Sequence, residues 1–409
     1  MSKLRARKAA RLSALLAICL TLTGCWDRME LNRLAITSAT GVDYKDGKWI
    51  VSYQVVIPAA ISAAMTATGG GAAKLPVVVY STSGNTIREA VWKSALESPR
   101  RLFFSHTRVL VVSREAAKQG LAPLIDIYLR NPDSRETVSV LISDDDARRI
   151  MEQLMQIQII PGDGIAETIV GEARDLSILP NMKMYNLTME LLGPAKSAII
   201  PEILISGTKG VTSADDLNRT TLSSKLRLGR LAALKDDKFV GWLERPEALG
   251  VSFMRNQVKA TSFSFSCSAS MPGDNSAFRL TLSKTKVTPR RLPDGRFEME
   301  IAVKGEGTLL ETSCPMDVNQ PEAVRQMERQ LEQKIVGIIE MSWQAVKKLD
   351  TDIVGFADSI HRAYPKTWRQ LAPNWSKAFG EIEIRPKADI TVKSLGLSGD
   401  AFKSKEERH

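Results

Sequence analysis

The first 25 residues constrain everything that follows them. Five cations precede an apolar stretch over residues 12–23, and no acid occurs before Asp27. This stretch is 12 residues long, whereas a membrane-spanning helix needs ~20. It ends in the lipobox-like sequence LTGC, in which the thiol of Cys25 would accept diacylglycerol. The pattern predicts a signal peptide over residues 1–24 and a mature lipoprotein that begins at Cys25, on the outer face of a membrane.

The alternative is a buried N-terminal helix in which Cys25 is incidental. The cations ahead of the apolar stretch and the polar sequence WDR directly after Cys25 disfavour it. No other stretch of the sequence approaches the length of a span. We therefore expect the chain after Cys25 to be water-soluble and held at the membrane by its lipid.

The mature chain carries a mild positive charge. The formal charge of the whole sequence is +10, and the leader holds five cations and no acid, so 10 − 5 = +5 remains. Such a charge suits a protein near anionic lipid or wall polymer. No dense Lys/Arg stripe with interleaved aromatics occurs, so we expect no nucleic-acid partner. The 385 residues left after removal of 24 from 409 are enough for two or three domains.

Two cysteines, Cys267 and Cys314, remain once Cys19 leaves with the leader and Cys25 carries lipid. Both fall on the outer strands of a predicted three-stranded meander. On that placement they lie roughly two strand spacings of ~4.8 Å apart, too far for a disulfide. We therefore expect no bridge between them, although export would permit one.

Residues 25–155 are interpreted as an N-terminal α+β domain. Alternating strands at 35–44 and 49–57 flank a turn and predict a hairpin. Strands and helices are then expected in alternation: strands at 76–80, 108–113 and 136–142, and helices at 86–96, 122–129 and after 146, the first capped by Asn85. The Ala/Gly-rich stretch at 58–74 is interpreted as a mobile loop.

The remainder divides at its proline, glycine and polar stretches. Residues 156–206 are interpreted as a smaller middle domain, 207–218 as a connector, 219–397 as a C-terminal domain and 398–409 as a flexible tail. The predicted fold class is α+β, with three consecutive domains of mostly antiparallel sheets with helices.

The C-terminal domain has the clearest pattern. Strands at 225–234 and 239–243 are expected to continue into the meander at 261–312, and strands at 381–384 and 389–392 close the chain. Apolar residues at helical spacing from Gln320 onward predict a helix of ~45 Å, long enough to lie across a sheet. Two shorter amphipathic units follow it.

No recognisable catalytic or metal-binding pattern occurs. The only histidines are His106, His361 and His409, and neither H-E-x-x-H nor C-x-x-C is present. No G-x-S-x-G marks a nucleophile, and the glycines at 69–71 lie in no phosphate-loop motif. We expect a protein that is not an enzyme, with no catalytic residues, no metal and no cofactor. A solute-binding lipoprotein of a transporter is the alternative, but it would need two doubly wound lobes.

Four segments of the sequence form a specific set: GCWDR at 24–28 with Glu30 and Leu31, SPRRLFFSH at 98–106, KDDKFVGWL at 235–243, and DIVGFADSIHRAYPKTW at 352–368. In this order they resemble the Ger(x)C lipoproteins, the C subunits of nutrient germinant receptors in endospore-forming bacteria. The resemblance implies a lipoprotein on the outer face of the spore inner membrane. It would act with an A-type and a permease-like B-type subunit in nutrient-triggered germination. The insert at 59–73 departs from the family pattern.

The resemblance leaves open which nutrient is sensed and whether this subunit contacts it. Arg100, Arg101 and His106, together with the outward side of the helix at 320–349, are the candidate contacts with partner subunits. Five motif aromatics are expected in the core: Phe103, Phe104, Trp242, Phe356 and Trp368. Asp352 and His361 are expected to cap or hydrogen-bond within the C-terminal domain.

Overall fold

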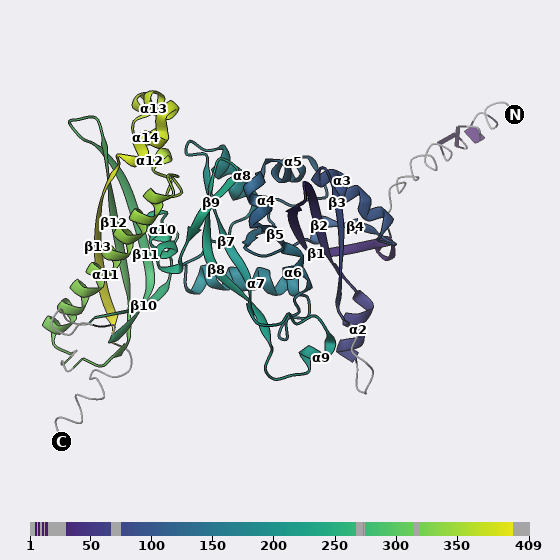
Figure 1. Cartoon of the computed structure of the whole chain (residues 1–409), viewed down its shortest axis with the longest axis horizontal. Helices are drawn as coiled ribbons and strands as arrows, with labels where there is room; N and C mark the ends of the chain where they lie inside the picture. The colour runs from purple at the N-terminus through teal and green to yellow at the C-terminus, as the bar shows by residue number, and fades with distance from the viewer. Residues whose placement is uncertain are drawn as a thin grey trace, which may run out of the picture.

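The computed structural model describes residues 30–66, 75–266, 273, 275–314, 317 and 319–395, and positions 5, 7, 8, 10, 11, 13 and 14. The predicted cleavage site, Cys25 and Cys267 lie outside these residues. Within the described part of the chain, no helix is long and apolar enough to cross a membrane. The molecule is elongated, with one sheet in each half (Figure 1).

The larger sheet has nine strands in the order β3-β2-β1-β5-β6-β7-β8-β9, with the short β4 beside β1. The strands are β1 (Leu34–Lys45), β2 (Lys48–Val56), β3 (Val77–Gly84), β4 (Arg101–Phe103), β5 (Val109–Ser113), β6 (Ser139–Ser143), β7 (Ser197–Gly207), β8 (Ser224–Lys235) and β9 (Lys238–Leu243). The central pairs β1–β5, β5–β6 and β6–β7 are parallel, and the outer pairs are antiparallel. The sequence analysis did not predict this parallel centre.

The predicted hairpin is confirmed by β1 and β2. Its two turn residues, Asp46 and Gly47, have φ angles of 52° and 76°. Two-residue hairpin turns with positive φ match the twist of the flanking strands, which explains why an Asp-Gly pair occupies this turn.

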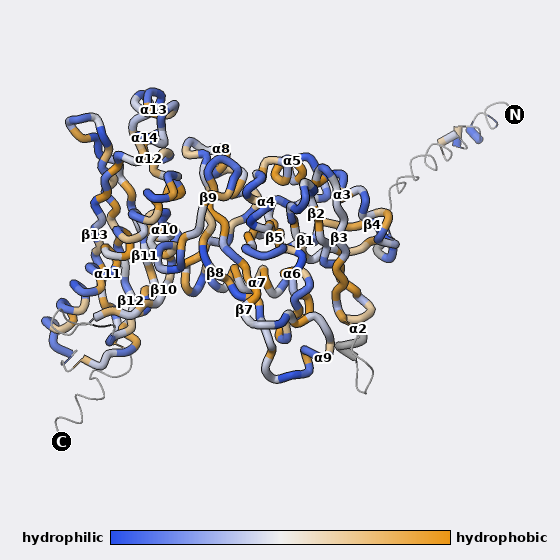
Figure 2. The backbone as a smooth tube through the Cα atoms, viewed as in Figure 1, coloured by the Kyte–Doolittle hydropathy of each residue, from blue (hydrophilic) through white to orange (hydrophobic). Residues whose placement is uncertain are grey.

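Helices cover both faces of the larger sheet. They are α3 (Ile87–Lys93), α4 (Arg114–Gln119), α5 (Ala122–Arg130), α6 (Ala147–Glu152), α7 (Pro161–Asp175) and α8 (Met184–Leu192). Successive residues of β1 point to opposite faces of the sheet and therefore reach different helices. Val42 lies with Ile87 of α3 and Leu124 of α5, whereas a Cβ on Gly41 would meet Ala147 of α6. Because β1 is buried on both faces, its sequence does not alternate regularly between apolar and polar residues. Figure 2 shows hydrophobic residues gathered around the central strands.

A helix, α2 (Pro58–Thr66), occupies part of the stretch that we expected to be a mobile loop. Proline suits the first helical turn and alanine has the highest helix propensity, so this composition favours a helix. Ala60 is buried. The loop interpretation is therefore wrong for residues 58–66, and residues 67–74 lie outside the described residues. The cap of α3 also differs from the prediction, because Thr86 rather than Asn85 accepts from the Glu89 backbone N–H, at 3.1 Å.

The smaller sheet has the order β10-β11-β12-β13. Its strands are β10 (Thr261–Phe265), β11 (Ser276–Arg291), β12 (Phe297–Thr312) and β13 (Glu383–Ser394). The first three form the predicted meander, and the single strand β13 runs parallel to β12 where two strands had been expected. The predicted long helix is α11 (Pro321–Lys348), which packs against α10 (Arg245–Met254) and β13. Its buried face includes Met327, Leu331, Ile335 and Val346, as the helical spacing predicted.

Three short helices, α12 (Phe356–Ala363), α13 (Pro365–Leu371) and α14 (Trp375–Gly380), follow α11 near one end of the sheet. They stand together at the top of the smaller-sheet half in Figure 1. The mixed helix and strand class predicted from the sequence is confirmed, as is the long helix against a meander.

The strands β8 and β9 were expected to continue into the meander, and that expectation is wrong. They pair with β7 and so belong to the larger sheet. Residues 156–206 likewise add α7, α8 and β7 to that sheet. The helix α10, which the sequence analysis missed, contacts β8 of the larger sheet and β11 and α11 of the smaller half. The sheets are therefore joined through α10.

Cys314 is disulfide-bonded and fully buried, so the expectation that it is unbridged is wrong. The expectation treated Cys314 as a strand residue, but β12 ends at Thr312, before Cys314. Residues beyond the ends of strands are not held at the strand spacing on which the expectation depended. Its partner lies outside the described residues, because none of the other cysteines is described.

Candidate functional site

A groove of about 540 Å³ lies beside the start of β1 and contains two of the three predicted contact residues. We call it the arginine groove and define it by Arg88, Trp92, Arg100, Arg101, Phe104 and Asp133. Strand pairing and a local turn shape the part of this groove around Arg100 and Arg101. The strand β4 pairs in parallel with β1, with Leu34 opposite Arg101. The Ser98 hydroxyl donates to the Arg100 carbonyl oxygen at 2.7 Å, which fixes the turn before β4.

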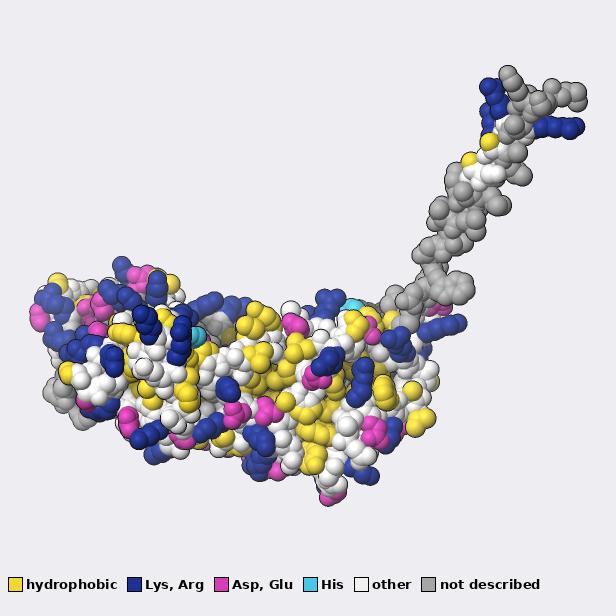
Figure 3. Space-filling model, turned by 90° about the horizontal axis from the view of Figure 1, so that it is seen from above, with side chains coloured by type: hydrophobic (Ala, Val, Ile, Leu, Met, Phe, Trp, Pro, Cys, Tyr) yellow, Lys and Arg dark blue, Asp and Glu magenta, His cyan; other side chains and the backbone are white. Residues whose placement is uncertain are grey.

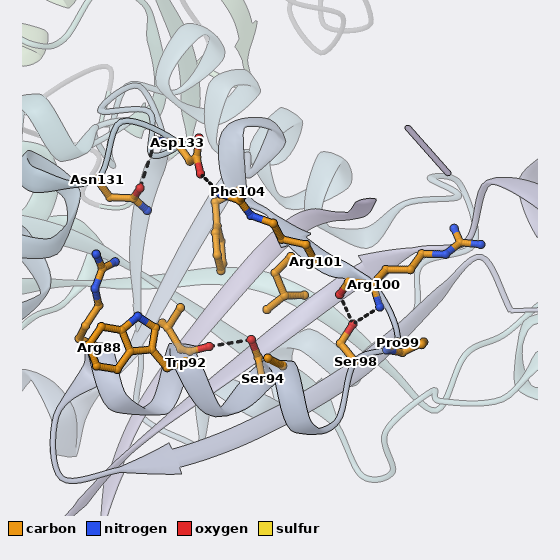
Figure 4. A pocket seen from close by; sticks show the side chains of 13 residues that line it. Arg88, Trp92, Ser94, Ser98, Pro99, Arg100, Arg101, Phe104, Asn131 and Asp133 are labelled. Atoms are coloured by element: carbon orange, nitrogen blue, oxygen red, sulfur yellow. Dashed lines mark hydrogen bonds and ion pairs between the residues drawn. The ribbon is translucent and has the colours of Figure 1, made fainter. Parts of the chain in front are cut away.

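The two adjacent arginines point in different directions (Figure 4). The guanidinium of Arg101 reaches across the groove to the Asp133 carboxylate, with Nη2 3.2 Å from Oδ2. Arg100 points away from this pair and makes no ion pair with any residue that the structure describes. Both side chains are exposed. Arg100 therefore offers an unpaired positive charge at the rim, while Arg101 helps to close the groove.

The wall formed by α3 is apolar and basic. The guanidinium carbon of Arg88 lies 5.7 Å from the centre of the Trp92 ring, one helical turn along. Trp92 is 68% exposed, and Leu96, in the short helix η2 (Ser94–Leu96), is 85% exposed. Exposed aromatic and aliphatic side chains beside arginine are typical of protein interfaces. Figure 3 shows hydrophobic side chains exposed among basic ones on this half of the molecule.

His106 does not belong to the arginine groove. It ends the short helix η3 (Phe104–His106), and its ring lies 5.4 Å from that of Phe103. Phe104 faces the arginine groove, whereas Ser105 and His106 line a neighbouring pocket. The structure thus brings Arg100 and Arg101 together and places His106 apart from them.

Sequence reasoning missed three groove residues, Arg88, Trp92 and Asp133. The i, i+4 spacing of Arg88 and Trp92 on a predicted helix was the available signal for their contact. No comparable signal exists for Asp133, because the fold brings it to Arg101 from 32 positions away.

The motif aromatics divide into two groups. Phe356 and Trp368 are buried, as predicted. Phe104 and Trp242 are partly buried and pack against the core, whereas Phe103 is partly buried and lies outside it. Trp242 lies under the guanidinium of Arg230, whose carbon is 4.2 Å from its ring centre.

Asp352 caps the N-terminus of α12, as predicted. Its carboxylate accepts from the backbone N–H groups of Gly355, Phe356 and Ala357 at 2.9, 3.0 and 2.7 Å. Burial raises the pKa of Asp352 to about 6, because desolvation outweighs these three hydrogen bonds. His361 is exposed, and its ring lies 5.7 Å from that of Trp368.

No cluster of three metal-ligating side chains occurs among the residues that the structure describes.

Two family models match nearly the whole chain. The Spore germination protein N-terminal domain matches residues 27–205, and the model described as Spore germination B3/GerAC like, C-terminal, matches residues 229–396. Spore germination protein KC of Bacillus subtilis (strain 168) is 27% identical over 97% of this chain and 98% of its own length. Spore germination protein B3 of the same organism is 22% identical over 96% of this chain and all of its own length.

A solved structure also has this fold. The crystal structure of the GerBC protein aligns with a TM-score of 0.55 over 90% of this chain and all of that one, at 15% identity. At this identity the likeness concerns the fold.

Proposed function

The chain belongs to the Ger(x)C family of spore germination proteins, and from this premise we propose that it is a lipid-anchored, non-enzymatic C subunit of a nutrient germinant receptor. The observation that carries the proposal is the match of both family models, to residues 27–205 and 229–396, and the lipoprotein export signal predicted directly before them supports it. The proposed location is the outer face of the spore inner membrane. The proposed partners are the A-type and permease-like B-type subunits, and the proposed role is receptor assembly or signalling.

The lipid anchor would hold the arginine groove near the membrane subunits. Leu34 follows Cys25 by nine positions, and a fully extended chain of that length spans at most ~30 Å. Leu34 pairs with Arg101 at the edge of the groove. Tethering raises the local concentration of this surface beside membrane partners, so modest contacts can support stable assembly.

The arginine groove supplies contacts of the kind that such docking needs. Arg100 is exposed and has no ion pair among the described residues, and Trp92 and Leu96 offer exposed apolar area on the α3 side of the groove. A rim charge mainly affects how fast partners associate, and a desolvated aromatic mainly affects how long they remain bound. We therefore assign Arg100 to steering and Trp92 to anchoring within this proposed interface. Arg101 would keep the groove in shape through Asp133.

The proposal is tested by purifying the native protein from spores and identifying the proteins that accompany it. Recovery of an A-type subunit and a permease-like B-type subunit is expected. Recovery of an ATPase with a transporter pore would instead favour a solute-binding lipoprotein. A strain carrying Trp92→Ala should give lower recovery of both subunits, whereas Tyr185→Ala, an exposed aromatic on α8, serves as the matched control. Equal recovery from both strains would exclude the groove from the interface.

A further inference from the structure

A second pocket, of about 370 Å³, lies next to the arginine groove and has a different chemical character. We call it the Lys183 pocket and define it by Ser105, His106, Arg108, Arg135, Thr137 and Lys183. These residues come from three separate places in the sequence: the segment that enters β5, the loop before β6, and the residue before α8. Residues from α7 complete the wall.

The lining carries three positive charges and no carboxylate. Arg108, Arg135 and Lys183 are the cations. Asp163 on α7 forms a long ion pair with Arg108, 3.8 Å from its Nε atom, and the two side chains are 36% and 60% exposed. A long pair that solvent reaches neutralises only part of the charge of the lining. Arg135 and Lys183 make no ion pair with any residue in the described part of the chain. The pocket therefore concentrates positive charge that the surrounding structure leaves uncompensated.

Lys183 is fixed in place and does not extend freely into solvent. Its backbone forms an isolated bridge with Ser139 at the start of β6. Its ammonium donates to the Ser139 hydroxyl at 2.7 Å, and that hydroxyl donates to the Asn181 side-chain oxygen at 2.9 Å. An ammonium group has three donors, so two remain available. Burial, and secondly the charge of Arg108, lower the pKa of Lys183. An anion in the pocket would relieve that repulsion.

We propose that the Lys183 pocket binds a phosphate group, with the ammonium of Lys183 and the guanidinium groups of Arg108 and Arg135 as its ligands. A carboxylate has one charge and two oxygens in one plane, whereas a phosphate group presents oxygens in several directions and carries up to two charges. Three cations from separate segments can contact a phosphate group from several directions, so they fit it better than a planar carboxylate. A volume on the order of ten water molecules also leaves space for an organic group attached to the phosphate.

Two sources could supply this phosphate group. One is a soluble phosphorylated compound, and the other is the headgroup of an anionic membrane lipid. The lipid source rests on the proposed anchor: Leu34 follows Cys25 by nine positions and pairs with Arg101 of β4, and β4 leads directly into η3, which carries His106. Phosphate binding itself is inferred from the charge and geometry of the pocket and does not depend on the receptor assignment.

The test uses the full-length lipoprotein in nanodiscs of uncharged phosphatidylcholine and follows inorganic phosphate binding by ³¹P NMR. Saturable binding is expected, with chloride at matched ionic strength as the reference. The double variant Arg135→Gln/Lys183→Met should weaken binding by roughly tenfold or more, because it removes two of the three proposed cationic ligands. The variant Arg130→Gln/Lys118→Gln removes the same charge from α5 and α4 and should bind like the wild type.

The single variant Arg135→Gln tests the proposal even if the double variant misfolds. Arg135 is exposed and its side chain has no partner in the described residues, so its replacement should not disturb the fold. It should weaken phosphate binding severalfold. Nanodiscs that contain phosphatidylglycerol distinguish the two sources. Suppression of phosphate binding there identifies the lipid headgroup, and unchanged binding identifies a soluble phosphate compound. Absence of saturable binding in phosphatidylcholine nanodiscs, or equal affinity in the Arg135→Gln and wild-type proteins, would overturn the proposal.

Discussion

The guanidinium of Arg101 lies 3.2 Å from the carboxylate of Asp133, while its neighbour Arg100 points away from both. Two arginines that look equivalent in the sequence therefore have different surroundings. The charge of Arg101 is satisfied within the chain, and the charge of Arg100 is available to another molecule. The proposed partner contact consequently falls mainly on Arg100.

Charge reversal of Arg100 should weaken the proposed assembly without unfolding the protein. Arg100→Glu is expected to lower recovery of the partner subunits from spores and to slow nutrient-triggered germination severalfold, because a rim charge steers association. Germination by agents that bypass receptors should stay normal. Arg219→Glu, at an exposed arginine between α9 (Ala214–Leu217) and β8 that has no ion pair in the described chain, is the control. Unchanged recovery with Arg100→Glu would remove Arg100 from the interface.

The Arg101–Asp133 pair should contribute little to stability. Its side chains are 63% and 43% exposed, and exposed ion pairs typically contribute ~0–1 kcal/mol. We expect Arg101→Ala to lower the free energy of unfolding by less than about 1 kcal/mol in a urea titration. A larger loss would show that Arg101 has a structural role. The proposed interface would then be tested through Arg100 and not through Arg101.

Replacement of Cys25 tests the proposed anchor. Cys25→Ala removes the only lipid acceptor in the predicted signal. Membrane fractionation should therefore give a product that is either unprocessed or soluble. Cys19→Ala is the control, because it removes a thiol from the same leader and leaves the lipobox intact. The anchor hypothesis fails if the Cys25→Ala protein still partitions with membranes, with no partner retaining it, and the spores germinate at the normal rate.

The ion pair between Glu202 and Arg230 should contribute far more to stability than exposed pairs do. Glu202 lies on β7 with its side chain 1% exposed, and its carboxylate receives the Arg230 guanidinium at 2.6 and 3.0 Å. Arg230 also reaches Asp144, directly after β6, at 3.1 Å. β6 and β7 are paired through one residue pair, Ile142 opposite Glu202. Arg230 therefore ties three strands together where backbone pairing is sparse.

We expect Glu202→Gln to destabilise the protein by about 3 kcal/mol in chemical unfolding, because it leaves a partly buried guanidinium without its main partner. Lys118→Gln, which breaks an exposed pair with Glu115 on α4, should cost less than about 1 kcal/mol. Similar losses for the two variants would show that the buried pair does not hold the strands together.

Local signals in the sequence were enough for some elements and not for others. The Asp46-Gly47 turn and the spacing from Met327 to Val346 predicted the first hairpin and α11, because both depend on residues that are near in sequence. The parallel centre of the larger sheet had no such signal. Parallel neighbours are joined by long crossovers, so no turn marks their pairing.

The candidate site was predictable to a similar extent. Arg100 and Arg101 stood out as a pair, but only tertiary structure shows that Asp133 pairs with one of them. The Lys183 pocket escaped notice because its cations are distributed over residues 108–183. The disulfide at Cys314 was missed because Cys314 was treated as held at the spacing of neighbouring strands, although β12 ends at Thr312, two residues before it.

Asp352 should make stability depend on pH in a direction opposite to that of an exposed, ion-paired carboxylate. Its pKa rises from 3.8 to about 6 on folding, mainly through burial, and the nearby Asp358 raises it further while three backbone N–H groups lower it. The folded state then holds the proton more tightly than the unfolded state. The contribution of Asp352 is fully present below pH 3.8 and declines as the pH rises to about 6.

The measurement compares the wild type with Asp352→Asn, in which this group cannot titrate. Groups that titrate alike in both proteins cancel in the difference between their free energies of unfolding. A shift of about two pKa units corresponds to about 3 kcal/mol, so the wild type should lose about that much relative to the variant between pH 4 and pH 7. Asp350→Asn is the control, because hydrogen bonding to Lys235 lowers the pKa of that mostly exposed aspartate. A wild-type minus Asp352→Asn difference that stays constant with pH would mean that Asp352 is ionised in the fold and that its three backbone hydrogen bonds outweigh its burial.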